Sequence, residues 1–182
     1  MIADSRPIRI AVFDAGQSAS AGRDENRCVS TPVQAWHDEH LQFQGLLEEL
    51  RRQVDAFHSG RRPDYERMLE IIATLRKSGE DSHHPREDAA FARLAKHCPD
   101  LALPLARLQQ EHRVIAHAGD KLYQLLNAAL DGAVLSRAEV EVAAATYLVY
   151  YGNHIAHEEE DILGRAAQAL TAEDWQAVRE AA

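Results

Sequence analysis

From residue 31 onward, apolar residues recur every three or four positions, and this period constrains the fold more than any other feature of the chain. A period near 3.6 places apolar side chains along one face of an α-helix. Four long segments follow it, at about residues 32–58, 63–94, 101–130 and 137–170. The sequence therefore predicts an all-α fold.

The ends of these segments carry helix-terminating and helix-starting residues. Thr31-Pro32 is typical of a helix start, and Ser136 with Glu139 forms a capping box. Glycines follow the first and third segments, and Ser78-Gly79 is a weak point within the second. Residues 171–174 cap a last short helix. Long helices joined by short links favour an up-down-up-down four-helix bundle with a short C-terminal helix.

Residues 1–30 differ from the rest and form an irregular N-terminal arm. Residues 7–13 are typical of a short strand, and residues 14–26 are rich in Gly, Ser and charge. A lone strand needs a partner. The arm is therefore either a mobile tail, a segment lying on the bundle, or a means of forming a homodimer. We expect two parts, the arm at 1–30 and the bundle at 31–182.

Composition excludes several function classes. With 29 acidic and 20 basic residues, the 182-residue chain has a formal charge of -9. This disfavours a nucleic-acid partner and an anionic membrane surface. No apolar run is long enough to span a membrane, and we find no signal peptide. The two cysteines lack a CxxC partner, so we expect a reducing, cytoplasmic location.

Ten histidines are present, and several fall on the apolar stripes. His83 precedes Glu87 by four residues, and His154 precedes Glu158 by four. Positions i and i+4 project from one face of a helix, so both side chains of each pair can reach one metal centre. The remaining candidates are one histidine on each of the other two helices and the neighbour of His83, namely His40, His112 and His84.

The positions of these residues along their helices agree. His40 lies eighteen residues before the end of its helix, and His83 lies twenty residues after the start of the next. At roughly 1.5 Å per residue these distances differ by about 3 Å. Likewise, His112 lies eighteen residues before the end of the third helix at residue 130, and His154 lies eighteen residues after Ser136, where the fourth helix begins. In an antiparallel bundle, all four groups are therefore expected in one layer.

The residue types in this layer favour a metal centre. Buried carboxylates are costly unless paired or metal-bound, and no Lys or Arg shares these stripe positions. Five imidazoles and two carboxylates exceed the needs of one tetrahedral zinc, and calcium or magnesium would prefer oxygen ligands. The set suits two iron or manganese ions, with Glu87 and Glu158 as bridges and positions open to a small molecule.

Neighbouring residues receive other interpretations. We expect His37 at the surface or in contact with a ligand, and His117 away from the centre. Tyr147 and Tyr151 either line a small-molecule pocket or pack with a hydroxyl bonded to a ligand carboxylate. Apart from Glu158, the acidic run at 158–161 is interpreted as a solvated face.

Several segments together resemble the hemerythrin-like, HHE cation-binding family. They are DSHHPREDAAFARL (81–94), QEHRVI (110–115) and NHIAHEEEDIL (153–163). The first helix, WHDEHLQFQGLLEEL (36–50), and the stretch AEDWQAV (172–178) are also similar to that family. The resemblance covers about residues 31–180.

The resemblance implies a hemerythrin-like bundle with a non-haem di-iron centre, bridged by carboxylates and an oxo or hydroxo group. Manganese and zinc are the possible substitutes, and O2 or NO is the implied small-molecule partner. The ligands implied are His40, His83, His84, Glu87, His112, His154 and Glu158.

The chain also departs from the family pattern. Hemerythrins proper carry a second histidine four residues along the third helix, where this chain has Ala116, and His117 lies one position too late. His84 is the candidate for the missing fifth imidazole, which leaves the division of ligands open. The cysteine-bearing module of the related iron-centre repair proteins is not recognisable in residues 1–30.

The leading hypothesis from the sequence is a cytoplasmic di-iron protein that binds or senses O2, NO or iron. Two alternatives stay open. One is a di-iron enzyme that reduces NO or peroxide, and the other is a structural bundle in which metal acts only as a staple.

Overall fold

The computed structural model describes residues 31–181, and all regular structure within this range is helical. The expected arm at residues 1–30 lies outside the described residues. The described helices are α1 (Pro32–His58), α2 (Tyr65–Leu75), α3 (His84–His97), α4 (Ala102–Leu130), α5 (Arg137–His157), α6 (Leu163–Ala169) and α7 (Ala172–Glu180).

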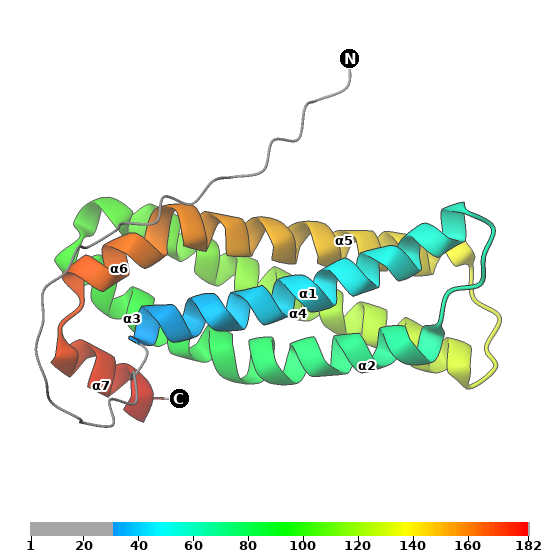
Figure 1. Cartoon of the computed structure of the whole chain (residues 1–182), viewed down its shortest axis with the longest axis horizontal. Coiled ribbons are helices and arrows are strands. Elements are labelled where there is room, and N and C mark those ends of the chain that lie inside the picture. Colours follow the sequence, from blue (N-terminus) through cyan, green and yellow to red (C-terminus); the bar gives the residue numbers. More distant parts are fainter. Residues whose placement is uncertain (1–30, 182) are drawn as a thin grey trace, which may run out of the picture.

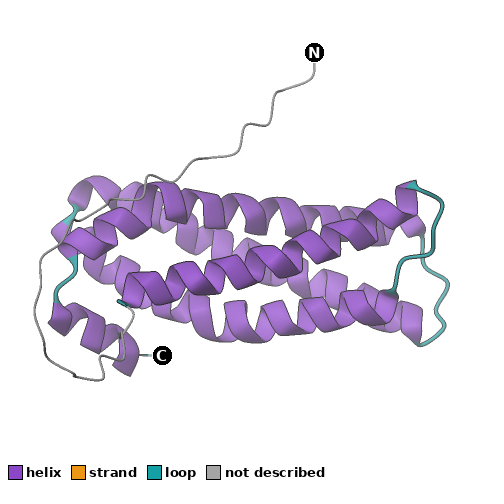
Figure 2. Ribbon diagram, in the orientation of Figure 1, coloured by secondary structure: helices purple, strands orange, loops and turns teal. Residues whose placement is uncertain are grey.

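Four helices lie side by side as a bundle: α1, α2, α4 and α5 (Figure 1). Each packs against two others, since α1 contacts α2 and α5, and α4 contacts α2 and α5. Consecutive helices are joined at alternate ends of the bundle, as Figure 2 shows for the teal connections. The α3 helix continues the course of α2, and α7 folds back against α3. The all-α bundle expected from the sequence is confirmed.

The helix termini form where the capping residues predict them. The Thr31 side chain accepts the backbone N–H of Gln34 at 3.2 Å, and the backbone N–H of Ser136 donates to Glu139 at 3.2 Å. Gly60 and Gly132 follow α1 and α4 with φ of 70° and 86°. Glycine tolerates this left-handed conformation without a Cβ penalty, so it ends each helix cleanly.

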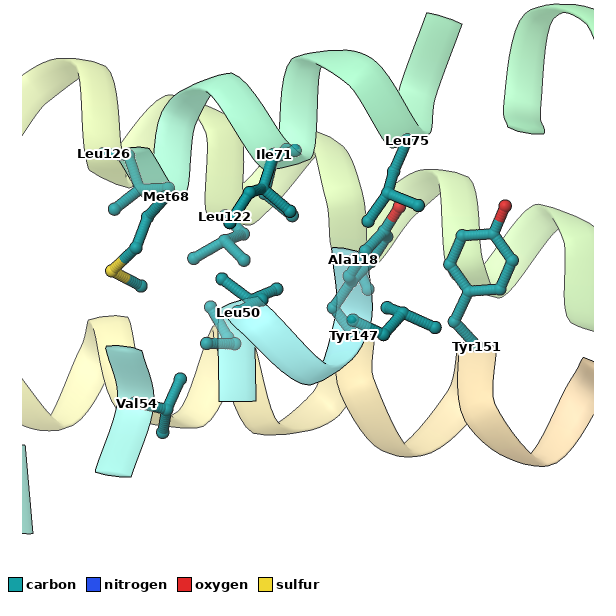
Figure 3. Packing of buried hydrophobic residues seen from close by; sticks show 14 of the residues in the cluster. Leu50, Val54, Met68, Ile71, Leu75, Ala118, Leu122, Leu126, Tyr147 and Tyr151 are labelled. Carbon is teal, nitrogen blue, oxygen red and sulfur yellow. The ribbon is translucent and has the colours of Figure 1, made fainter. Parts of the chain in front are cut away.

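Two apolar cores fill the bundle. The larger, which we call the long core, occupies the space between α1, α2, α4 and α5 (Figure 3). Its fully buried members include Leu50, Met68, Ile71, Ile72, Leu75, Leu122 and Leu126. The second, which we call the end core, joins α3, α6 and α7 to the first turns of α1 and α4. It contains Trp36, Phe91, Leu94, Leu105, Leu108, Ile162, Leu163, Trp175 and Val178.

Two wider turns interrupt the regular helices. The weak point expected at Ser78-Gly79 lies in a π-helix, η1 (Arg76–His83), so the chain stays helical there. A second π-helix, η3 (Glu158–Ile162), interrupts the helix expected to run to residue 170. The i→i+5 turn inserts one residue and rotates the side chains beyond it, and such turns occur frequently at functional sites.

Gly79 allows η1 to pack closely on α5. A Cβ at this position would lie 2.1 Å from the hydroxyl oxygen of Tyr151. Figure 3 shows Tyr147 and Tyr151 one turn apart on α5, facing the other helices. The missing side chain therefore lets the Tyr151 ring enter the core beneath the π-turn.

Within residues 31–181, no helix is both long enough and apolar enough to cross a membrane.

Candidate metal centre

The seven residues selected from the sequence come together in one layer between the long core and the end core. Each of the four bundle segments contributes: His40 comes from α1, and His112 and His154 come from α4 and α5. Both π-helices end or begin in this layer, because His83 closes η1 and Glu158 opens η3. All seven side chains are at most 5% exposed, namely His40, His83, His84, Glu87, His112, His154 and Glu158.

The nitrogen and oxygen atoms of these side chains form two overlapping groups. One group holds three histidines and Glu87, with the ligand atoms within 4.8 Å of one another: His84, His112 and His154. The other holds His40 and His83, again with Glu87. Since Glu87 belongs to both groups, the arrangement offers two adjacent positions for metal ions that share one carboxylate.

Both carboxylates reach both groups. Glu87 lies with Oε1 2.8 Å from Nε2 of His83 and with Oε2 3.4 Å from Nε2 of His112. Glu158 lies with Oε1 3.1 Å from Nε2 of His154 and with Oε2 3.4 Å from Nε2 of His40. Each carboxylate therefore spans the two positions, as a bridging ligand would.

Four of the histidines are held from outside by a second set of carboxylates. Each uses Nδ1 for this contact and directs Nε2 into the layer. The pairs are His83 with Glu39, His40 with Glu159 at 2.6 Å, His112 with Asp88 at 2.9 Å, and His154 with Glu111 at 3.3 Å. These carboxylates link successive segments of the bundle, and the link from η3 to α1 closes the ring.

The outer contacts determine where the imidazole protons lie. An ionised carboxylate only accepts hydrogen bonds, so Nδ1 of each of the four rings must carry the donated proton. In a neutral imidazole the lone pair is then on Nε2. Nε2 of His40 lies 2.9 Å from Nε2 of His83, and the same atoms of His112 and His154 are 3.0 Å apart. Lone pairs at this separation require positive charge between them.

The carboxylates add to this requirement. Both oxygens of Glu87 and of Glu158 are buried without a hydrogen-bond partner among the described residues, and so is Nε2 of His84. A buried, unpaired carboxylate is costly, whereas carboxylate and imidazole atoms of this kind coordinate metal ions. The residues present therefore fit a metal centre.

The pKa values show how strongly the layer attracts positive charge. Burial opposes protonation of His83 and His112. Nevertheless the charge of Glu87 and the hydrogen bond with Glu39 raise the pKa of His83 to about 9. The hydrogen bond with Asp88 and the nearby carboxylates of Glu158 and Glu87 raise the pKa of His112 to about 11.

His84 behaves differently, because burial and the neighbouring imidazoles hold its pKa well below the usual value. The ring therefore stays neutral, and a nitrogen lone pair remains available to coordinate a metal ion. The same ring stacks on that of His112 at 4.2 Å, with the planes 7° apart.

The contacts around the layer correct two expectations from the sequence, one for Glu159 and one for Tyr147. Glu159 was assigned to a solvated face, but it bonds His40 and also Nδ1 of His37 at 2.9 Å. The second correction concerns tyrosine, since the hydroxyl of Tyr147 donates to Glu80 at 3.3 Å rather than to a carboxylate of the layer. His117 is exposed on α4, away from the layer.

Sequence reasoning missed the outer carboxylates Glu39, Asp88 and Glu111, although the sequence carries a signal for them. Each stands next to a residue of the layer on its own helix and contacts a histidine of the adjacent segment. An acidic residue beside a buried ligand position therefore lies at the right height to support the neighbouring helix. Such second carboxylates fix the tautomer and orientation of a ligating imidazole.

Comparison with known proteins agrees with this geometry. The family model described as hemerythrin, "Hemerythrin HHE cation binding domain", matches residues 31–166, which span all four bundle segments and the whole layer. A search of curated proteins and a search of solved structures gave no match to the chain. Because the family model covers most of the chain, and because a buried His/Glu centre able to hold metal lies within the match, the protein belongs to the hemerythrin HHE cation-binding family.

Proposed function

We propose that this protein holds a non-haem di-iron centre and uses it to bind or sense O2, NO or iron. The observation that carries the proposal is the layer itself. Five imidazoles and two carboxylates are buried together with their coordinating atoms directed inward, and four of the imidazoles are held from outside by carboxylates.

The two groups suggest how the ligands divide. One ion would be held by His84, His112 and His154, and the other by His40 and His83. Glu87 and Glu158 would bridge the two ions. This division takes His84 as the fifth imidazole and is supported by its unpartnered Nε2. The ion with two imidazoles has fewer protein ligands, so it is the position where a small molecule would bind.

Iron is favoured by the chemistry of the donors. Imidazole and carboxylate without thiolate suit iron and manganese, and iron supplies reversible binding of O2 or NO when the centre is loaded. The protein's own contribution is to keep the layer between two apolar cores, which exclude water, and to keep four imidazoles in the Nδ1-protonated form.

The experiment is anaerobic reconstitution of the metal-free full chain with Fe(II), Mn(II) or Zn(II), followed by metal analysis. We expect about two iron ions per chain, since the layer contains two groups of ligands. Visible spectra under nitrogen, air and NO should then differ, with a charge-transfer band on exposure to O2. Clearly fewer iron ions per chain, or preferential retention of zinc or manganese, would contradict the proposal.

A further inference from the structure

A chain of aromatic rings leads from the metal layer to the end of the bundle. The ring of Trp36 lies 6.1 Å from that of His83, with 64° between the planes. Trp36 in turn lies 5.2 Å from Trp175, with 76° between their planes. The chain contains only these two tryptophans, and both are in this path. Figure 1 shows α7, which carries Trp175, beside the start of α1.

The outer end of this path opens on a pocket. The pocket has a volume of ≈ 470 Å³ and lies between the first turn of α1, α3 and α7. Trp36 and Trp175 form part of its wall, and the side chains of Arg86 and Arg179 flank them. Arg179 has no ion-pair partner among the described residues, and Arg86, although paired with Glu39, carries further N–H donors. Guanidinium groups beside indole rings therefore favour an anionic ligand in this pocket.

The inner end of the path meets the metal layer at His83. Arg86 of the pocket donates to Glu39 at 2.7 Å, and Glu39 bonds Nδ1 of His83. His83 therefore contacts the aromatic path directly and is linked to Arg86 of the pocket through Glu39. No other tryptophan is available, and indole is more readily oxidised than the phenylalanine rings nearby.

We propose that Trp36 and Trp175 supply electrons to the metal centre from an anionic one-electron reductant bound beside Arg86 and Arg179. The proposal rests on the proposed iron centre and adds an activity, the reduction of hydrogen peroxide at the expense of that reductant. Each electron passes from Trp36 towards the centre through His83, Trp36 is restored from Trp175, and Trp175 is restored by the reductant.

The reaction balances with ascorbate as the probe. Hydrogen peroxide takes up two electrons and two protons, its O–O bond breaks, and two water molecules form. Two ascorbate monoanions each give one electron and one proton and leave as ascorbyl radical anions. Both indoles and the centre end in the state in which they began.

The test uses the full chain after iron loading, with the iron content and helicity of every variant measured first. Hydrogen peroxide is added without ascorbate, and radicals are recorded by electron paramagnetic resonance. We expect a tryptophan radical in the wild type, its loss in Trp36→Phe, and its retention in Trp175→Phe. Ascorbate-dependent peroxide reduction should fall severalfold in both variants.

The matched control is Tyr65→Phe at the start of α2, which removes an oxidisable hydroxyl away from the layer and keeps the ring that packs on Phe57. It should leave both the radical and the rate of ascorbate consumption unchanged. A further readout is mass spectrometry of the peptide containing Trp175. Its oxidation by peroxide should require iron and Trp36, because the oxidising equivalent arrives through Trp36 rather than from solution.

The outcomes separate the two proposals. If the chain binds no iron, the proposed function itself fails. If it binds iron but both tryptophan variants show wild-type ascorbate rates, or if Trp175 oxidises equally in Trp36→Phe, the electron path is wrong. Trp175→Phe leaves Trp36 and all seven residues of the layer in place, so it decides the matter even where Trp36→Phe disturbs folding.

Discussion

The long core and the metal layer follow one another along the same four segments of the bundle, with η1 and α3 continuing α2 and with η3 continuing α5. They are stabilised by different interactions. In the long core, buried side chains such as Leu50, Ile72 and Leu122 pack in regular α-helical turns. In the layer, the buried side chains are ionisable, and two of the four segments pass through it as π-helices. The long core is stabilised because apolar surface is removed from water, and the layer is stabilised because its buried charges are paired.

This difference separates two properties that a mutation can affect. A change in the long core should lower the free energy of unfolding and leave the inward-facing ligands unchanged. A change in the layer should lower metal affinity while the apolar cores still hold the bundle. Variants in each region, with a control for each, test that separation.

The largest effect is expected from removing one imidazole of the layer. His154→Ala should weaken iron binding by more than about 100-fold, because it removes a ligand together with the imidazole that Glu111 supports from outside the layer. The matched control is His117→Ala on the exposed face of α4, which should keep full iron content. Equal loss of iron in both variants, measured by metal analysis after dialysis, would contradict the assignment.

A cavity in the long core should act on stability instead. Ile72 is fully buried, so Ile72→Ala should lower the free energy of unfolding by about 2–5 kcal/mol, as measured by urea denaturation. The folded variant should still bind the wild-type amount of iron. Val142→Ala, at a side chain that is 66% exposed, is the control and should change stability by less than about 0.5 kcal/mol. Loss of iron from folded Ile72→Ala would show that the two regions are not separable.

The outer carboxylates should have an intermediate effect. Glu39→Gln keeps the shape of the side chain but replaces an ionised acceptor of His83 and Arg86. We expect iron affinity to fall about 10–100-fold, with little change in helicity. Competition with a chelator gives the affinity, and Glu66→Gln in the first turn of α2 is the control. A wild-type affinity in Glu39→Gln would mean that the outer ring does not support the layer.

The smallest effect is a dependence of stability on pH that arises outside the layer. Burial raises the pKa of Glu80 to about 7, although the charge of Arg76 and the Tyr147 hydroxyl oppose the shift. Because the folded-state pKa is above the unfolded value, the stability that Glu80 contributes is present at low pH and is lost as pH rises through 7.

Glu80→Gln tests this dependence, because the amide cannot ionise and still accepts the Tyr147 hydroxyl. The variant should gain stability relative to wild type as pH rises from about 5 to about 8 in urea denaturation. The comparison between the two proteins cancels the pH dependence of the layer itself. A constant difference across this range would show that Glu80 does not titrate there.

Much of the fold can be predicted from the sequence, and the exceptions have physical causes. The apolar period and the caps at Thr31 and Ser136 predict the limits of α1 and α4 and the start of α5, because these signals are local. The π-turns are not predicted. An i→i+5 turn changes the angular position of the residues after it without changing the composition, and Gly79 indicates a close contact only once Tyr151 is placed opposite it.

The layer shows the same limit. Helical phase and distance along each helix are enough to select residues that the structure brings together, since both depend only on regular geometry. The carboxylates that bond Nδ1 of the ligand histidines cannot be recognised in this way. Glu39, Asp88 and Glu111 look like ordinary charged residues of a helix surface until the position of the adjacent helix is known. The resemblance to a family implies the same ligands but leaves the role of His84 open.

The most direct test of the central claim is anomalous diffraction at the iron edge from crystals of the iron-loaded protein. We predict two peaks in the layer, one among His84, Glu87, His112 and His154 and the other beside His40, His83 and Glu87. The absence of iron from the layer, or a peak elsewhere on the protein, would contradict it.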